Sequence, residues 1–83
     1  MDRKHTYGIV VFFGRNENGT FDKLGQTQLL SYFTALNVYA NTPNPASQLV
    51  GGSTLEEANN NVDDIVNKMK DKSYVEEYVD PYL

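Results

Sequence analysis

The sequence predicts an α+β domain, a small antiparallel sheet with two helices on one face. Residues 7–14 are a run of apolar, β-branched and aromatic side chains, typical of a strand buried on both faces. Residues 54–70 repeat apolar side chains at helical spacing behind a helix-capping pattern. Short alternating segments elsewhere suit strands. In the order strand, helix, strand, strand, helix, strand, these elements match a ferredoxin-like βαββαβ topology, our leading guess, with the first strand central.

Length and composition limit the classes of protein to consider. Eighty-three residues suit one domain, so we expect residues 1–83 to form a single unit, with residues 1–5 flexible. The absence of cysteine excludes disulfides, thiolate metal sites and cysteine nucleophiles. The single histidine, His5, lies in a charged N-terminal segment, where we expect a solvated side chain and not a catalytic base. No apolar run approaches the ~20 residues of a membrane span and no signal-peptide-like segment is present, so we expect a cytoplasmic protein without membrane contact.

Residues 15–35 allow two interpretations. Asn18-Gly19 favours a turn after the first strand, so residues 20–23 can return as the second strand of a hairpin. Apolar side chains between residues 29 and 36 instead recur at helical spacing, with Thr27 as a candidate N-cap. We prefer the helix, and the strand interpretation of this region stays open.

The next segments are interpreted as two short strands. Residues 36–41 alternate apolar with small or polar side chains, as a half-buried strand does. Prolines at positions 43 and 45 indicate a turn, because proline fixes φ and has no backbone donor. Residues 46–50 can then return as a strand that ends at Gly51-Gly52.

The last third contains the clearest helix. Ser53 is the predicted N-cap, with Glu56 at the third helical position of a capping box, and the helix extends from about residue 54 to residue 70. Residues 73–79 alternate valine with tyrosine and glutamate, which we interpret as a final strand. Their four-residue spacing of tyrosines and valines also fits a helix, and Pro81 ends the element either way.

The charged side chains are unevenly distributed along the chain. The net charge is −4, yet residues 24–55 contain no charged side chain, and residues 56–83 contain eight carboxylates against three lysines. Direct binding of nucleic acid is disfavoured, because phosphate contacts need clustered lysine and arginine. The carboxylates occur as adjacent pairs on regular elements, which does not suit a calcium loop. The glycine-rich helix start at residues 51–54 lacks the lysine of a phosphate loop, so no metal or cofactor is expected.

The first strand raises the question of what covers its second face. If both helices pack on one face, large apolar side chains remain on the other, and such a patch is commonly covered by a second copy of the chain. We therefore expect a homodimer. The predicted dimer or ligand face consists of Tyr7, Val10, Phe12 and Tyr39.

The acidic last third suggests a function. The purely structural interpretation of this region is a solvated helix and an edge strand protected by its charges. Our hypothesis is a non-enzymatic inhibitor or regulator that, like a DNA mimic, covers the basic surface of a larger partner such as a nucleic-acid-binding protein. The predicted partner-binding residues are Glu56, Glu57, Asp63, Asp64, Glu76, Glu77, Asp80, Tyr74 and Tyr78. The alternatives are a dimeric ligand-binding or enzyme domain with a pocket at the open sheet face, and a structural assembly subunit.

Overall fold

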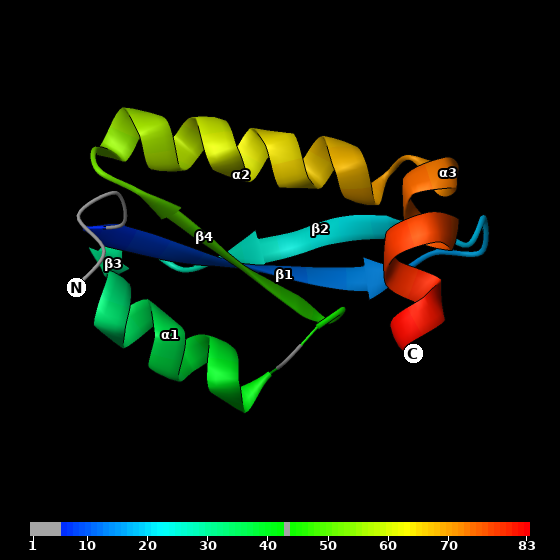
Figure 1. Ribbon diagram of the computed structural model, residues 1–83, viewed down its shortest axis with the longest axis horizontal. Coiled ribbons are helices and arrows are strands. Elements are labelled where there is room, and N and C mark those ends of the chain that lie inside the picture. Colours follow the sequence, from blue (N-terminus) through cyan, green and yellow to red (C-terminus); the bar gives the residue numbers. More distant parts are fainter. Residues whose placement is uncertain (1–5, 43) are drawn as a thin grey trace.

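The computed structural model describes residues 6–42 and 44–83 and contains a small antiparallel sheet with helices (Figure 1). Strand β1 (Tyr7–Arg15) pairs along one edge with β4 (Ser47–Gly52). Along its other edge it pairs with β2 (Phe21–Gln26) and β3 (Leu30–Ser31). The α+β class and the central position of the first strand are confirmed.

Strands β2 and β3 occupy residues 21–26 and 30–31. The helix that we preferred from about Thr27 is therefore wrong up to residue 31, and the hairpin alternative is correct there. The decisive contacts are not local in sequence. Thr27, the predicted helix cap, instead bonds to Val10 of β1: its backbone N–H donates to the Val10 carbonyl at 2.9 Å, and its Oγ1 accepts from the Val10 N–H at 3.1 Å. These two bonds continue the ladder between β2 and β3.

Helix α1 (Tyr32–Asn41) begins later than predicted and occupies the segment assigned as a strand. Ser31 is the N-cap, and its Oγ accepts a hydrogen bond from the Thr34 N–H at 3.3 Å. The strand predicted at residues 36–41 is therefore wrong. A six-residue alternation is too short to distinguish a strand from half of a helix, and packing of Ala35 against the sheet decides for the helix.

Helix α2 (Leu55–Met69) confirms the predicted amphipathic helix, with the N-cap displaced by one residue. Thr54 Oγ1 accepts from the Glu57 N–H at 3.1 Å, while Ser53 Oγ donates to Glu57 Oε2 at 2.8 Å. The hydroxyl groups of Ser53 and Thr54 therefore both form hydrogen bonds with Glu57 in the first turn of α2. The side chains of Ala58, Val62 and Met69 are buried in the core.

The chain after α2 is helical where a final strand was predicted at residues 73–79. It consists of α3 (Lys72–Tyr74), the π-helix η1 (Val75–Val79) and the 3₁₀ helix η2 (Asp80–Tyr82). The strand prediction is wrong: a strand would place Val75, Glu77 and Val79 on one face, whereas Val75 and Val79 are buried in the core and Glu77 is exposed, as helical spacing requires.

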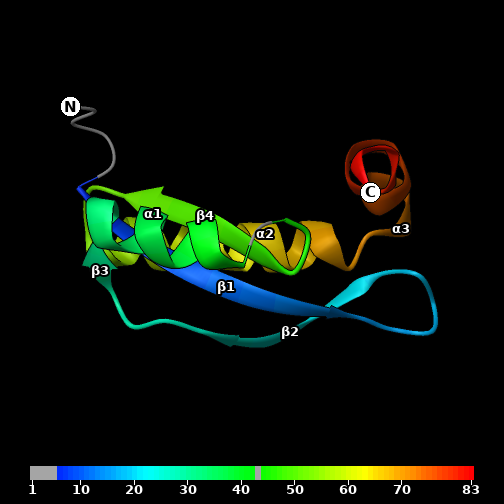
Figure 2. The same ribbon diagram turned by 90° about the horizontal axis from the view of Figure 1, so that it is seen from below.

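The two long helices lie on opposite faces of the sheet, which corrects the prediction of one shared face. Figure 2 looks onto the sheet with α1 in front of it and α2 behind. A Cβ atom on Gly8 of β1 would lie 2.6 Å from Ala35 Cβ of α1. A Cβ atom on Gly52 of β4, which is paired with Tyr7, would lie 2.6 Å from the Ala58 nitrogen of α2. Because side chains alternate along a strand, these neighbouring positions mark two different faces.

Helix α1 therefore covers the second face of β1 where it lies over Gly8 and Val10. Val10 is 0% exposed, and the apolar core cluster lies on the other face, under α2 and the C-terminal segment. The structure agrees with the ferredoxin-like prediction in its class, an α+β sheet with helices. The order of elements differs, because the chain begins with a hairpin and runs β1-β2-β3-α1-β4-α2.

Strand β4 forms the edge of the sheet beyond β1. The Phe13 N–H donates to the Ala46 carbonyl, so by alternation the backbone groups of Ser47, Leu49 and Gly51 point away from β1. On α2, Asn61 Nδ2 donates to the Gly51 carbonyl at 2.8 Å. Helix α2 thus satisfies part of this outer edge.

Two predictions concern the chain ends and membranes. Residues 1–5, with His5, lie outside the described residues. Within residues 6–42 and 44–83, no helix is long and apolar enough to cross a membrane.

Candidate functional site

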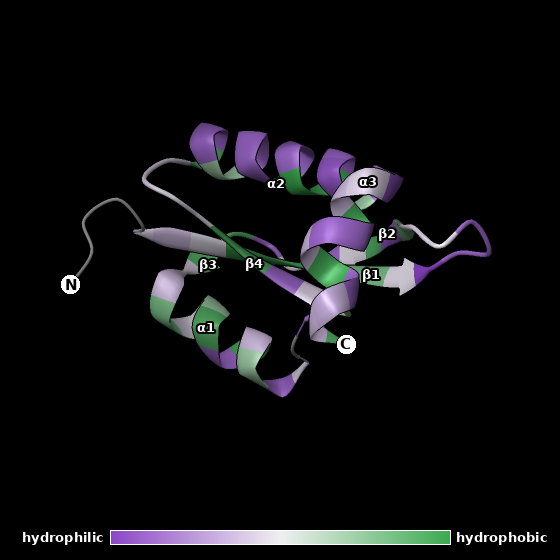
Figure 3. Ribbon diagram, turned by 45° about the vertical axis from the view of Figure 1, so that its right-hand side comes forward, coloured by the Kyte–Doolittle hydropathy of each residue, from purple (hydrophilic) through white to green (hydrophobic). Residues whose placement is uncertain are grey.

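The outer surface of α2 carries an exposed set of carboxylates, which we call the acidic face. It consists of Glu56, Glu57, Asp63 and Asp64, all exposed. Helical periodicity turns these side chains away from the buried stripe that packs on the sheet. Figure 3 shows this division, with α2 hydrophilic on its outer side and hydrophobic toward the sheet.

The acidic face has no cationic partner among the residues that the structure describes. The ion pair found among the described residues joins Arg15 and Asp80 and leaves these four carboxylates unpaired. Three of the four also accept no hydrogen bond from a described side chain, and Glu57 accepts one from Ser53. Since a charge without an internal partner is fully available to solvent or to a ligand, this face is available for electrostatic binding.

The carboxylates of the acidic face form two pairs that follow one another along the axis of α2. A helix rises about 1.5 Å per residue, so the pair at Glu56 and Glu57 lies about 10 Å along α2 from the pair at Asp63 and Asp64. Phosphates on one DNA strand advance about 3.4 Å per nucleotide along the axis. The two carboxylate pairs therefore span a length of about three nucleotide steps.

The predicted acidic residues of the C-terminal segment are separated by the structure into two kinds. Glu76 and Glu77 are exposed on η1, so they extend the negative surface onto a second helical element and not onto an edge strand. Asp80 is instead paired with Arg15, with Nη2 lying 3.0 Å from Oδ1 and 3.1 Å from Oδ2. Its charge is compensated, so we remove Asp80 from the candidate partner-binding residues.

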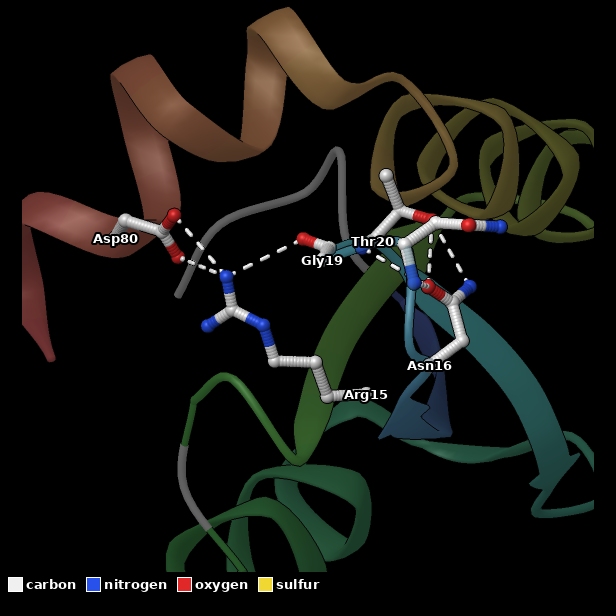
Figure 4. A network of polar contacts seen from close by, with 6 residues as sticks. Arg15, Asn16, Gly19, Thr20 and Asp80 are labelled. Atoms are coloured by element: carbon white, nitrogen blue, oxygen red, sulfur yellow. Dashed lines mark hydrogen bonds and ion pairs between the residues drawn. The ribbon is translucent and has the colours of Figure 1, made fainter.

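The Arg15–Asp80 pair belongs to a network that connects the first hairpin to the C-terminal segment (Figure 4). Arg15 Nη2 also donates to the Gly19 carbonyl at 3.2 Å. Asn16 Oδ1 accepts from the backbone N–H of Asn18 and of Thr20, which closes the turn. These contacts fix the C-terminal segment beside the end of β1.

The tyrosines of the C-terminal segment line a cavity of about 230 Å³, which we call the tyrosine pocket. Its lining residues are Asn44, Pro45, Gln48, Tyr74, Tyr78, Val79, Tyr82 and Leu83. The structure brings together the two predicted tyrosines, Tyr74 and Tyr78, with ring centroids 5.1 Å apart. The four-residue spacing of the tyrosines was the only sequence signal for this pocket. The contribution of Gln48 depends on tertiary packing and was missed.

The predicted dimer or ligand face is not one open surface. Val10 is fully buried and Phe12 and Tyr39 are half-buried, while Tyr7 belongs by alternation to the other face of β1. The cavity found in the structure lies elsewhere, at the C-terminal segment. Among the described residues, no group of three or more His, Cys, Asp or Glu side chains is arranged to hold a metal ion.

Comparison with known proteins gives no relative: no family model, no curated protein and no solved structure matches this chain. The acidic face and the tyrosine pocket are therefore the basis for a functional proposal.

Proposed function

We propose that the protein is a non-enzymatic interaction protein whose acidic face covers a basic surface on a larger partner. It acts as an inhibitor or regulator, in the manner of a DNA mimic, and a nucleic-acid-binding protein is the partner that fits best. The observation that carries this proposal is the set of four exposed carboxylates on one helix face, which have no cationic partner within the described residues.

The distribution of charge supports a directional encounter. The acidic face lies on the α2 side of the sheet, and helix α1 on the other side carries no charged side chain. A one-sided field steers a basic partner toward α2 and increases the association rate at low salt. Screening at ~0.15 M salt shortens the range of this field to about 8 Å, so binding weakens as salt rises.

Two variants that change the net charge equally test the acidic face. Asp63→Asn with Asp64→Asn removes two charges from α2, and Glu17→Lys changes the net charge by the same +2 in the β1–β2 turn. With a decalysine peptide at low salt, we expect at least fivefold weaker binding for the α2 variant and less than twofold for the control. The melting temperatures of both variants should stay near that of the wild type.

Equal weakening in both variants would show that net charge alone attracts the peptide and would remove the acidic face as a binding site. Affinity capture from a cell lysate in low and in high salt then identifies the natural partner. Capture of basic proteins that is lost at high salt supports the proposal.

The α1 side favours a second copy of the chain as an additional partner. On this charge-free helix Phe33 is 75% exposed and Leu36 43% exposed. Two copies that meet through α1 keep their acidic faces apart, which avoids repulsion between them. We therefore propose a homodimer that presents two acidic faces outward.

Sizing at increasing protein concentration tests the dimer. The wild type should shift from monomer to dimer, and Phe33→Ser should remain monomeric with unchanged stability, because its side chain is largely exposed. A wild type that stays monomeric at millimolar concentration would contradict the dimer.

A further inference from the structure

The tyrosine pocket is built from two segments that are far apart in the sequence, residues 44–48 and residues 74–83. Tyr74, Tyr78 and Tyr82 follow one another at four-residue intervals through α3, η1 and η2. Gln48 comes from β4, and Asn44 from the loop before it. A sheet edge and a helical segment thus close on a single cavity.

The polar groups of the pocket are free to bind a ligand. The hydroxyl groups of the three tyrosines make no hydrogen bond to any part of the chain that the structure describes, and neither do the side-chain amides of Gln48 and Asn44. Tyr78 is 57% exposed and Tyr82 85% exposed. Several uncommitted donors and acceptors therefore converge on one concave, partly aromatic surface.

The tyrosine rings are positioned by buried residues next to them in the sequence, not by hydrogen bonds of their own hydroxyl groups. Val75 and Val79, which directly follow Tyr74 and Tyr78 in the sequence, are buried in the core, and Arg15 fixes the end of this segment through Asp80. The pocket therefore exists without a ligand, so little ordering of the protein is needed when one binds.

We infer that the tyrosine pocket receives an arginine side chain of the basic partner. This inference rests on the proposed function and identifies the partner's anchoring residue. Tyrosine faces attract cations, and a planar guanidinium stacks on an aromatic ring while its N–H groups remain available. The amide oxygens of Gln48 and Asn44 are suitable acceptors for those donors.

Charge and size both favour this occupant. The exposed carboxylate of Glu77 precedes Tyr78 on η1 and adds a negative charge to the element that lines the pocket, although the lining side chains are neutral. A cavity of about 230 Å³ is smaller than the 300–1,000 Å³ typical of sites for drug-sized ligands, which suits a single side chain. Lysine fits less well, because its ammonium group is compact and strongly hydrated.

Binding of decaarginine and decalysine peptides to the intact protein tests the inference. The acidic face attracts both peptides, whereas the pocket distinguishes them. The wild type should bind decaarginine about fivefold more tightly, in keeping with one cation–π contact at an exposed site. Tyr78→Ala and Tyr82→Ala should each reduce that preference to less than twofold without weakening decalysine binding. Leu24→Ala, which removes an exposed apolar side chain on β2 outside the pocket and outside α1, is the control and should retain it.

The outcomes separate this inference from the proposed function. Equal binding of the two peptides by the wild type overturns the pocket and leaves the acidic face intact, while failure of both peptides to bind overturns the proposed function as well. An arginine preference that survives both tyrosine substitutions places the selectivity elsewhere and overturns the pocket. Comparable binding of a decaproline peptide reassigns the pocket to proline-rich ligands and overturns the arginine assignment.

Discussion

Two glycines determine how closely each helix approaches the sheet. At Gly8, an added Cβ would meet the Ala35 side chain of α1. At Gly52, it would meet backbone atoms of Ala58, at 2.6 Å from the nitrogen and 2.9 Å from Cα. A backbone atom cannot rotate away as a side chain can, so Gly52 is the stricter of the two requirements. The sequence interpretation treated this glycine as the end of a strand and missed its role in packing.

Replacement of Gly52 therefore has a defined expected effect. Gly52→Ala should lower the free energy of unfolding by about 1–3 kcal/mol, because the methyl group overpacks the contact with α2. Gly25→Ala, on β2, is the matched control, since no atom lies within 4 Å of its added Cβ. Urea unfolding of both variants checks this, and equal stabilities would contradict the close approach of α2 to β4.

At the scale of elements, the sequence identified those whose pattern is long or repeated. Strand β1 and helix α2 were predicted because a strand buried on both faces and a 15-residue amphipathic helix each carry many agreeing positions. Residues 36–41 and 73–79 were assigned to the wrong structure, because six or seven residues fit both periodicities. Their helical state is fixed by Ala35 against Gly8 and by Val75 and Val79 in the core, contacts that depend on the whole fold.

The start of α2 gives a test that distinguishes the predicted cap from the observed one. Thr54→Ala should lower the free energy of unfolding by about 1 kcal/mol, because the Glu57 N–H loses its acceptor. Ser53→Ala should have a smaller effect, since Ser53 contacts only the exposed Glu57 carboxylate. Thermal or urea unfolding measures both, and a larger loss for Ser53→Ala would restore Ser53 as the cap.

At the scale of the whole molecule, the sheet separates two chemically different sides. The α2 side carries the acidic face, while helix α1 on the other side carries no charged side chain and exposes Phe33 and Leu36. The carboxylates of α2 were predicted correctly as surface residues because helical periodicity alone turns them outward. The ion pair between Asp80 and Arg15 and the position of Gln48 in the tyrosine pocket were not predicted, because both join segments that are far apart in the sequence.

One-sided negative charge predicts how stability depends on salt. As NaCl rises from about 0.01 M to about 1 M, the screening length falls from about 30 Å to about 3 Å, which weakens repulsion among the carboxylates. The free energy of unfolding should therefore increase with salt. In the double variant Asp63→Asn, Asp64→Asn, the free energy of unfolding should increase less with salt. Denaturant titrations at each salt concentration measure this. An identical salt dependence would mean that the acidic face carries no net repulsion.

The hydrogen bond from Asn61 to the Gly51 carbonyl covers part of the outer edge of β4. Residues 47–52 of β4 contain no charge and no proline, the features with which proteins usually prevent edge strands from recruiting other chains. Helix α2 supplies that protection instead, through one side-chain amide and the close contact at Gly52. Detachment of α2 would expose a template for cross-β assembly, so weakening this one helix should convert a folded protein into fibrils before the rest of the sheet is lost.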